Sequence, residues 1–285
     1  MSGRVLPGPD VAWTGGSPRD YAQCVLAPNP SPWTLEGTNT WILGQAGACV
    51  IVDPGPESAE HHAAVLAACE ERGESPRMIL LTHGHIDHSE GARTLAERLR
   101  VPVRAWDPHF SFDPAHVGNA EVLSHGEILD IQGRDVSVLA TPGHSSDSVC
   151  LVVGDCVLTG DTVLGRGTTV VAYPDGNLGE YLASLEALRT FCADNGVASL
   201  LPGHGPVLDD PVGVLHAYQE HRAVRLEQVR AVWSGGGDVE EIVDIVYADV
   251  PQAVRAAAVL TVRAQVAYLA GSAAQTLDID DENLA

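Results

Sequence analysis

The chain has 285 residues, 45% of them hydrophobic, so it can bury a sizeable core and is not a disordered protein. Its formal net charge of −22 makes long-range attraction of a polyanion unfavourable, which counts against a nucleic-acid partner without deciding against one. The N-terminus carries no apolar signal-peptide segment, and no run of about 18 apolar residues occurs. We therefore expect a cytoplasmic protein that does not span a membrane.

The first predicted elements are strands. Two apolar segments flank a proline-rich turn between residues 24 and 44, and this pattern predicts an antiparallel pair. Residues 48–52 predict the next strand, which ends at Asp53. We interpret Asp53 as a carboxylate that accepts backbone N–H bonds and orients neighbouring loops, in preference to a metal ligand.

A helix is predicted over residues 57–72, because apolar side chains recur at helical spacing and Gly73 follows as a terminator. His61 and His62 lie in its first turn and do not follow the end of a strand. We therefore expect both imidazoles to be solvated.

The densest chemistry lies in residues 82–88, with the sequence THGHIDH, directly after an apolar run that predicts a buried parallel strand. Functional groups in open α/β sheets lie on the loops at the carboxyl ends of strands. Three imidazoles and a carboxylate therefore leave the sheet edge together. We interpret His83, His85, Asp87 and His88 as a metal site.

Three later apolar runs end in the same way, in a loop where glycine immediately precedes a candidate ligand. Glycine lets the backbone approach a site closely, so the repetition predicts loops that converge on one point. The runs are 136–140, 156–159 and 199–201, and the ligands that follow them are His144, Asp161 and His204.

Seven such groups are too many for one tetrahedral ion and suit two ions. Neutral imidazole and carboxylate are ligands of Zn²⁺ and also of Fe and Mn, and a carboxylate can bridge a pair of ions. The ligand types predict two zinc ions, with iron and manganese left open.

Helices and strands alternate up to His204, which indicates an α/β sandwich. After residue 210 the pattern predicts helices alone, so we divide the chain into a catalytic domain, 1–210, and a helical unit, 211–285, that completes the substrate cleft. The helices expected there are 216–233, 239–247 and 251–269.

Two sets of basic groups are candidates for substrate binding. Arg166 stands between two glycines after Asp161, and three further groups share one helix face. For each set two interpretations stay open: a solvated charge, or a clamp for an anionic substrate. The three groups on the helix are His221, Arg222 and Arg225.

The six cysteines are scattered without Cys-x-x-Cys spacing and mostly sit in apolar runs. This distribution predicts reduced, buried thiols, not disulfides or a zinc knuckle.

The THGHIDH tract and the three downstream ligands, in that order, closely resemble the metallo-β-lactamase superfamily. The resemblance implies a four-layer αββα sandwich. It also contributes to the division of the ligands: His83, His85 and His144 for the first metal, Asp87, His88 and His204 for the second, and Asp161 as the bridge.

Residues 29–40 and 221–228 are similar to the corresponding stretches of the β-lactamase-like protein 2 family, whose helical tail resembles a winged helix. That resemblance implies two activities. Animal members of the family cut single-stranded RNA, whereas relatives with the same seven ligands hydrolyse the thioester of acylglutathione. True zinc β-lactamases usually lack the bridging aspartate, so Asp161 argues against a dedicated lactamase.

We therefore predict a metal-dependent hydrolase in which a hydroxide between two metal ions attacks an acyl carbon or phosphorus. Asp87 is expected to orient the nucleophile or move its proton while ligating the second ion. The acidic surface favours a small-molecule thioester, ester or lactam. The alternative is an endoribonuclease that cleaves single-stranded RNA, and the oligomeric state stays open.

Overall fold

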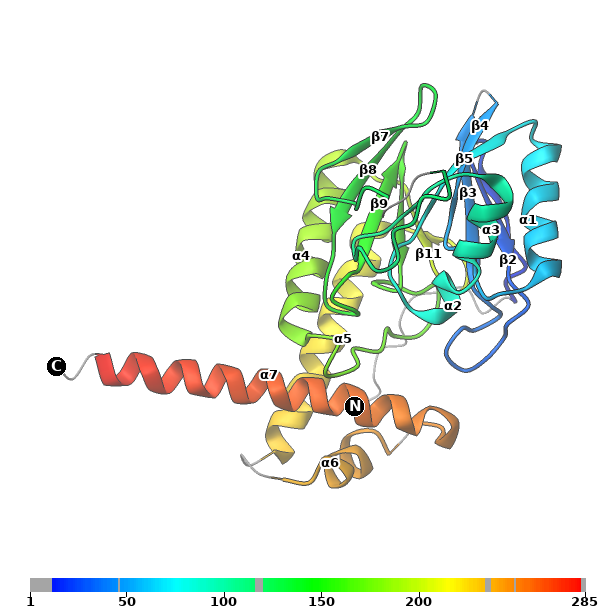
Figure 1. The fold of residues 1–285 in the computed structure, drawn as a ribbon. Helices are drawn as coiled ribbons and strands as arrows, with labels where there is room; N and C mark the ends of the chain where they lie inside the picture. The colour runs from blue at the N-terminus through cyan, green and yellow to red at the C-terminus, as the bar shows by residue number, and fades with distance from the viewer. Residues whose placement is uncertain (1–11, 46, 116–119, 234–236, 249, 283–285) are drawn as a thin grey trace.

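Two six-stranded sheets pack face to face at the centre of the molecule, and helices cover both outer faces (Figure 1). The computed structural model describes residues 12–45, 47–115, 120–233, 237–248 and 250–282, with residues 272–282 as backbone only. The layers run helix, sheet, sheet, helix. This confirms the predicted αββα sandwich.

The first sheet is built in chain order, so each strand lies beside the next one in the sequence. The predicted antiparallel pair is present as β2 and β3, and β4 and β5 are parallel, so the loop that follows β5 leaves the sheet beside the end of β4. Its strands are β1 (Gly16–Arg19), β2 (Ala22–Leu26), β3 (Asn39–Gln45), β4 (Ala48–Val52), β5 (Ser75–Leu80) and β6 (Val103–Arg104).

The second sheet has the order β12-β11-β10-β9-β8-β7. The three predicted ligand-bearing strands are all there, but β8 pairs antiparallel with both neighbours, and only β10 and β11 are parallel. Its strands are β7 (Ile128–Asp130), β8 (Asp135–Ala140), β9 (Val149–Val153), β10 (Cys156–Gly160), β11 (Ser199–Pro202) and β12 (Leu208–Asp209).

The main core lies between the sheets, where apolar side chains from both inner faces are fully buried. Helices α1 (Ala59–Glu71) and α3 (Ala92–Leu99) cover the first sheet, and α4 (Leu178–Asn195) covers the second. Burial of these faces is the main force that holds the layers together. Large members of the central core are Trp41, Leu43, Leu80, Val138, Leu151 and Leu158.

Helix α1 starts two residues later than predicted, because the Ser58 side chain accepts the N–H of His61 and caps the helix there. The expectation for its two histidines was wrong. His61 and His62 are only 2% and 3% exposed. His61 Nε2 lies 2.8 Å from Thr40 Oγ1 on β3, so its ring is directed into the molecule.

The C-terminal part is helical, as predicted, in the residues that the structure describes from 211 onward. The amino-terminal half of α5 packs on α4 in the outer layer, whereas Val229 near its end joins a cluster with α6 and α7. Helix α5 therefore contributes to both units, and the boundary at residue 210 stays a prediction. The helices are α5 (Pro211–Val232), α6 (Val239–Val246), the short 3₁₀ helix η1 (Gln252–Val254) and α7 (Arg255–Glu282).

Helix α7 crosses the end of the molecule next to α5 and α6 (Figure 1). By length and composition alone, the span Gln252–Gly271 is long and apolar enough to cross a membrane. Part of that apolar surface is buried, because Val262 and Leu269 pack against residues of α5 and α6. The core helix of a globular protein has the same property. All six cysteines are free and buried, which confirms the prediction for them.

Candidate metal centre and active-site cavity

The ring nitrogens of the first three predicted ligands lie close together. His83 and His85 leave the carboxyl end of β5, and His144 leaves the end of β8. His83 Nε2 and His144 Nε2 each lie 3.0 Å from His85 Nδ1. Together the three rings form a group whose nitrogens could hold one metal ion.

The second group brings together residues that are far apart in the sequence. His88 comes from the short helix α2 (Ile86–Ser89), and His204, 116 residues later, comes from the end of β11. Their Nε2 atoms are 3.2 Å apart, and Asp87 Oδ2 lies 3.2 Å from His204 Nε2. Asp87, His88 and His204 form a second candidate ion site.

Asp161, at the end of β10, lies between the two groups. Its Oδ2 is 3.8 Å from His144 Nε2 and 3.4 Å from His204 Nε2, and its Oδ1 is 3.5 Å from His88 Nε2. The carboxylate therefore faces both groups, in the position that the sequence predicts for a bridge.

The donor set fits divalent cations. Imidazole nitrogens that face one another can share only one proton, so three convergent rings cannot satisfy one another by hydrogen bonding. Asp161 Oδ1 is buried and has no hydrogen-bond partner among the described residues. Buried carboxylate oxygens are normally paired or coordinate metal, so both observations indicate cations between these groups. The assignment of all seven side chains as ligands stays a prediction.

Asp53 fixes the tract that carries the ligands, as predicted for it. Its Oδ1 accepts the N–H of Thr82 at 2.8 Å, and its Oδ2 accepts the Thr82 hydroxyl at 2.6 Å and lies 2.9 Å from His88 Nδ1. Asp53 has φ +51°, a left-handed conformation that aspartate tolerates better than most residues. An outer carboxylate of this kind orients the ring and determines which nitrogen faces the metal.

Backbone carbonyls orient two other rings. His144 Nδ1 lies 2.7 Å from the Val170 oxygen, and His204 Nδ1 lies 3.1 Å from the Gly37 oxygen. Each ring donates its Nδ1 proton to the carbonyl, so Nε2 is the nitrogen that faces the site. Both carbonyls come from segments distant in sequence from the ring they hold.

The electrostatics favour the protonation states that metal binding needs at part of the site. Burial lowers the pKa of His144 to about 4, so this ring is neutral at pH 7. Burial acts to raise the pKa of Asp161, but His204 and His88 lower it well below the usual range. For His204, burial acts downward, but Asp161 and Asp87 raise its pKa to about 10. A cation would displace the His204 proton, so metal binding at this group releases protons.

Gly203 lets the β11 loop pass close to the site. A Cβ at this position would lie 2.6 Å from Asp161 Oδ1 and 2.8 Å from His88 Cε1. No side chain fits there without moving a ligand. This is the physical reason for the glycine that precedes His204.

Side chains of α4 and α5 hold the loop that follows Asp161, and these contacts were not predicted. Tyr218 Oη accepts the N–H of Leu164 at 2.9 Å and lies 3.2 Å from the Gly167 oxygen, and Tyr181 Oη donates to the Thr162 oxygen at 2.8 Å. Tyrosines at helical spacing look like ordinary core residues, so no local signal marks these contacts. Arg222 Nη2 adds a bond to the Thr169 oxygen.

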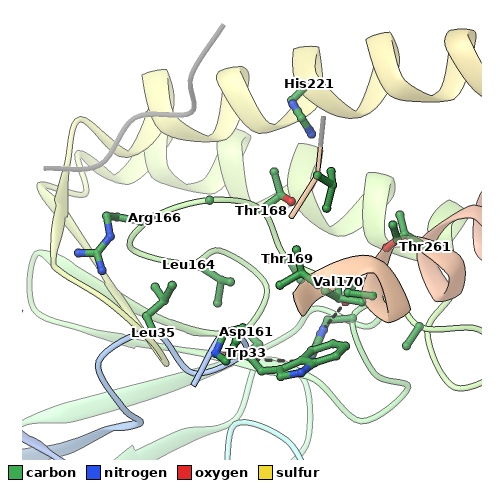
Figure 2. A pocket seen from close by; sticks show the side chains of 18 of the residues that line it. Trp33, Leu35, Asp161, Leu164, Arg166, Thr168, Thr169, Val170, His221 and Thr261 are labelled. Carbon is green, nitrogen blue, oxygen red and sulfur yellow. Dashed lines mark hydrogen bonds and ion pairs between the residues drawn. The ribbon is translucent and has the colours of Figure 1, made fainter. Parts of the chain in front are cut away.

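A cavity of about 400 Å³ opens over the two groups of ligands, and His85, Asp87, His144 and Asp161 form part of its lining. Figure 2 shows His221 projecting from α5 toward Thr168 in the loop that follows Asp161. The cavity therefore lies between the sandwich and the C-terminal helices.

Three of the four predicted substrate-binding residues line this cavity, namely Arg166, His221 and Arg222. Arg166 forms an ion pair with Glu36, and Arg222 is only 4% exposed. Arg225 is not part of the lining. Its Nη1 donates to the Val246 oxygen at 2.7 Å, and its guanidinium stacks over Tyr247. The structure thus splits the basic face that the helix pattern brought together.

Another part of the lining comes from α7 and the segment before it, and sequence reasoning named none of its residues. It consists of small and apolar side chains, which carry no chemical signature in a sequence. These residues are Tyr247, Val250, Val254, Ala257, Ala258 and Thr261.

Residues 33–204 match the family model described as the metallo-beta-lactamase superfamily, a family of hydrolases that bind divalent metals, typically zinc or iron. The chain is 30% identical to a beta-lactamase-like protein 2 homolog of Caenorhabditis elegans, over 86% of this chain and 82% of the relative. It is 32% identical to an atrochrysone carboxyl ACP thioesterase of Aspergillus chevalieri, over 87% of this chain and 79% of the relative.

Among solved structures, a beta-lactamase domain protein from Burkholderia ambifaria has the same fold, with a TM-score of 0.75 and 24% identity. The match covers 94% of this chain and 92% of that one, so it includes the C-terminal helices. Fold, ligand geometry and sequence agree: the chain belongs to the metallo-beta-lactamase superfamily and resembles its beta-lactamase-like protein 2 members.

Proposed function

We propose that the protein hydrolyses acyl thioesters, with related esters as slower substrates, at a centre of two zinc ions. The observation that carries the proposal is the cavity over the ligand groups, whose walls are largely uncharged. Such walls suit a neutral acyl compound better than a phosphodiester chain. The thioesterase name of the Aspergillus relative, which the chain matches over most of its length, supports the same class of reaction.

Bound divalent cations would polarise the carbonyl and make water a stronger nucleophile at neutral pH. The protein's own residues supply position and proton handling. Asp87 faces the cavity with its side chain 27% exposed, whereas His88 and His204 behind it are buried. A carboxylate that is both a ligand and open to the cavity can orient a water molecule and accept its proton.

His85 and Asp161 line the same cavity and complete the set of groups around the reacting carbonyl. The Asp53 and Val170 contacts hold the rings of His88 and His144 in place before substrate arrives. This preorganisation means that little reorganisation is needed during the reaction.

Single-stranded RNA is less well supported as the substrate. An RNA site needs several cations along a groove to neutralise phosphates. Here Arg166 is paired with Glu36, Arg225 is turned away to α6, and the chain carries a formal net charge of −22. The buried Arg222 and the neighbouring His221 are too few for such a groove.

The test compares three substrates on zinc-loaded protein: an acyl-N-acetylcysteamine thioester, the lactam nitrocefin and a labelled single-stranded oligoribonucleotide. We expect thioester cleavage that disappears with a chelator, returns with zinc and responds little to salt. Rapid cleavage of the RNA with a steep decline at rising ionic strength would overturn the proposal in favour of the nuclease. Asp87→Asn serves as the inactive control for all three substrates.

A further inference from the structure

We propose that the C-terminal helices form an acyl-chain pocket, and that the preferred substrates carry an apolar acyl group of medium length and not acetyl. This inference rests on the proposed thioesterase function and adds the part of the substrate that the protein selects. Ala257 and Ala258 of α7, with Val254 of η1, form the selecting wall.

The wall is continuous with the metal centre. His85, Asp87, His144 and Asp161 line the same cavity as the α7 residues, so an acyl group whose carbonyl lies over the ligands reaches the wall directly. Figure 2 shows Thr261 on α7 at one side of the pocket and Asp161 and Trp33 at its floor. A chain that leaves the carbonyl away from the sandwich therefore enters the space in front of α7.

Apolar groups from two loops of the sandwich also line the cavity. Trp33 and Leu35, from the loop before β3, and Leu164 and Val170, from the loop after β10, belong to the same lining. Trp33 is 46% exposed although it is large and apolar. An exposed tryptophan at the rim of an apolar cavity is typical of a ligand site, because it gains contact area when the ligand binds.

The apolar character of the wall determines which half of a thioester binds there. The thiol arm of a carrier contains amide groups, which lose hydrogen bonds with water when they enter an apolar space without partners. A hydrocarbon chain makes no hydrogen bonds with water, so its transfer into an apolar space is favourable. The acyl half therefore occupies the wall, and the thiol half stays toward solvent.

The depth of the pocket depends on the two alanines. Ala257 and Ala258 are 7% and 6% exposed, so they lie at the inner surface of the cavity and not at its rim. Alanine leaves the largest free space that a helix can offer with a Cβ present. The cavity volume of about 400 Å³ is in the range of sites for small organic ligands.

The first experiment measures binding without turnover. The probes are analogues of acyl-N-acetylcysteamine thioesters in which methylene replaces the sulfur, with acyl chains from acetyl to octanoyl, titrated into the full-length protein by calorimetry. We expect the Kd to fall about threefold to fourfold for each added methylene until the cavity is full. A Kd that does not change with chain length overturns the proposal.

The second experiment fills the pocket. Ala257→Phe should weaken binding of the octanoyl analogue at least tenfold and leave the acetyl analogue within about twofold, because only the long chain reaches that side chain. Ala256→Phe is the matched control, since Ala256 is the preceding residue of α7 and is exposed. Equal effects of the two substitutions, or no effect of Ala257→Phe, would contradict the assignment of the wall.

Val254→Phe provides the same test at a half-buried position of η1 if thermal unfolding shows that Ala257→Phe has lost its fold. Turnover of the matching thioesters separates this inference from the function on which it rests. Length-dependent binding without any thioester cleavage rejects the thioesterase and keeps the pocket. Cleavage with the same kcat/KM for acetyl and octanoyl thioesters keeps the thioesterase and rejects the pocket.

Discussion

The cavity has a floor of candidate metal ligands, namely His85, Asp87, His144 and Asp161, and a wall of apolar residues from η1 and α7. These two parts are built by different means. On the floor, nearly every functional side chain has a directional partner, such as Asp53 on His88 and the Val170 oxygen on His144. On the α7 wall, small apolar residues contribute shape and no directional contact. The floor comes from the sandwich, and the wall comes from helices that pack on its end.

The two parts of the cavity serve different properties of the hydrolase. Chemistry needs fixed atoms, so the floor uses hydrogen bonds with defined angles, and a small displacement there is costly. Selection of an acyl chain needs only volume and hydrophobic contact, which tolerate substitution. Changes to the floor should therefore alter turnover and metal content, whereas changes to the wall should alter the order of substrates.

The largest effect is expected at Asp87. Asp87→Asn should lower kcat by at least about a hundredfold, because an amide cannot accept the proton of the nucleophile. His83, His85 and His144 are untouched, so the variant should retain much of the first metal, as measured by elemental analysis. Asp175→Asn is the control, since Asp175 Oδ2 lies only 3.7 Å from His85 Nε2 but is exposed. Wild-type turnover in Asp87→Asn would exclude the role.

Asp53 tests the layer behind the ligands. Asp53→Asn keeps the shape but weakens the acceptor for His88 Nδ1 and the Thr82 hydroxyl, so zinc affinity should fall about 10-fold to 100-fold. Competition with a chromogenic chelator measures the change. Asp135→Asn, at an exposed carboxylate on β8, should leave the affinity as it is. An unchanged zinc affinity in Asp53→Asn would mean that the loop holds its ligands without this carboxylate.

Tyr218 links the floor to the helices that carry the wall. Tyr218→Phe removes the acceptor of the Leu164 N–H in a buried place, which should lower the free energy of unfolding by about 1–3 kcal/mol. Because the same loop carries the Val170 oxygen that orients His144, kcat should fall more than KM rises. Tyr173→Phe, at an exposed ring, is the control for both measurements. A loss of stability with unchanged kcat would confine Tyr218 to packing.

The smallest effect is a pH dependence of stability from a histidine outside the ligand groups. Burial lowers the pKa of His61 to about 4 from 6.5, so the unfolded chain binds more protons there between these values. Stability from this group is complete above pH 6.5 and declines as the pH falls, by at most about 1.4 kcal/mol per pH unit.

His61→Gln removes this contribution. The stability difference between wild type and variant should therefore narrow as the pH falls from roughly 7 to 5, in urea unfolding of the zinc-loaded proteins. A difference that stays constant over this range would show that His61 does not titrate as its burial requires.

Much of the site could be predicted because its signals are local. A run of apolar residues followed by glycine and a histidine or aspartate marks the end of a strand and its ligand at once, as at Gly203 and His204. All four such loops do meet. Asp53 was interpreted correctly because the turn that follows its strand is also a local signal.

The errors have a common cause. The expectation of solvated rings at His61 and His62 used their position in a helix, but burial depends on what packs against that helix, here β3 and the loop around Gly55. The helix pattern grouped Arg222 with Arg225, yet the contacts to Thr169 and Val246 turn the two guanidinium groups to different neighbours.

The candidate ligands, the strands that present them and the order of the layers could be inferred from the sequence, because apolar periodicity and strand-end chemistry are properties of neighbouring residues. Only the tertiary structure decided the direction of β8, the clamp from Tyr218 and the wall at Ala257. Each of these depends on contacts between segments far apart in the chain, and an alanine or tyrosine in a helix has the same local pattern whether it faces a core or a cavity.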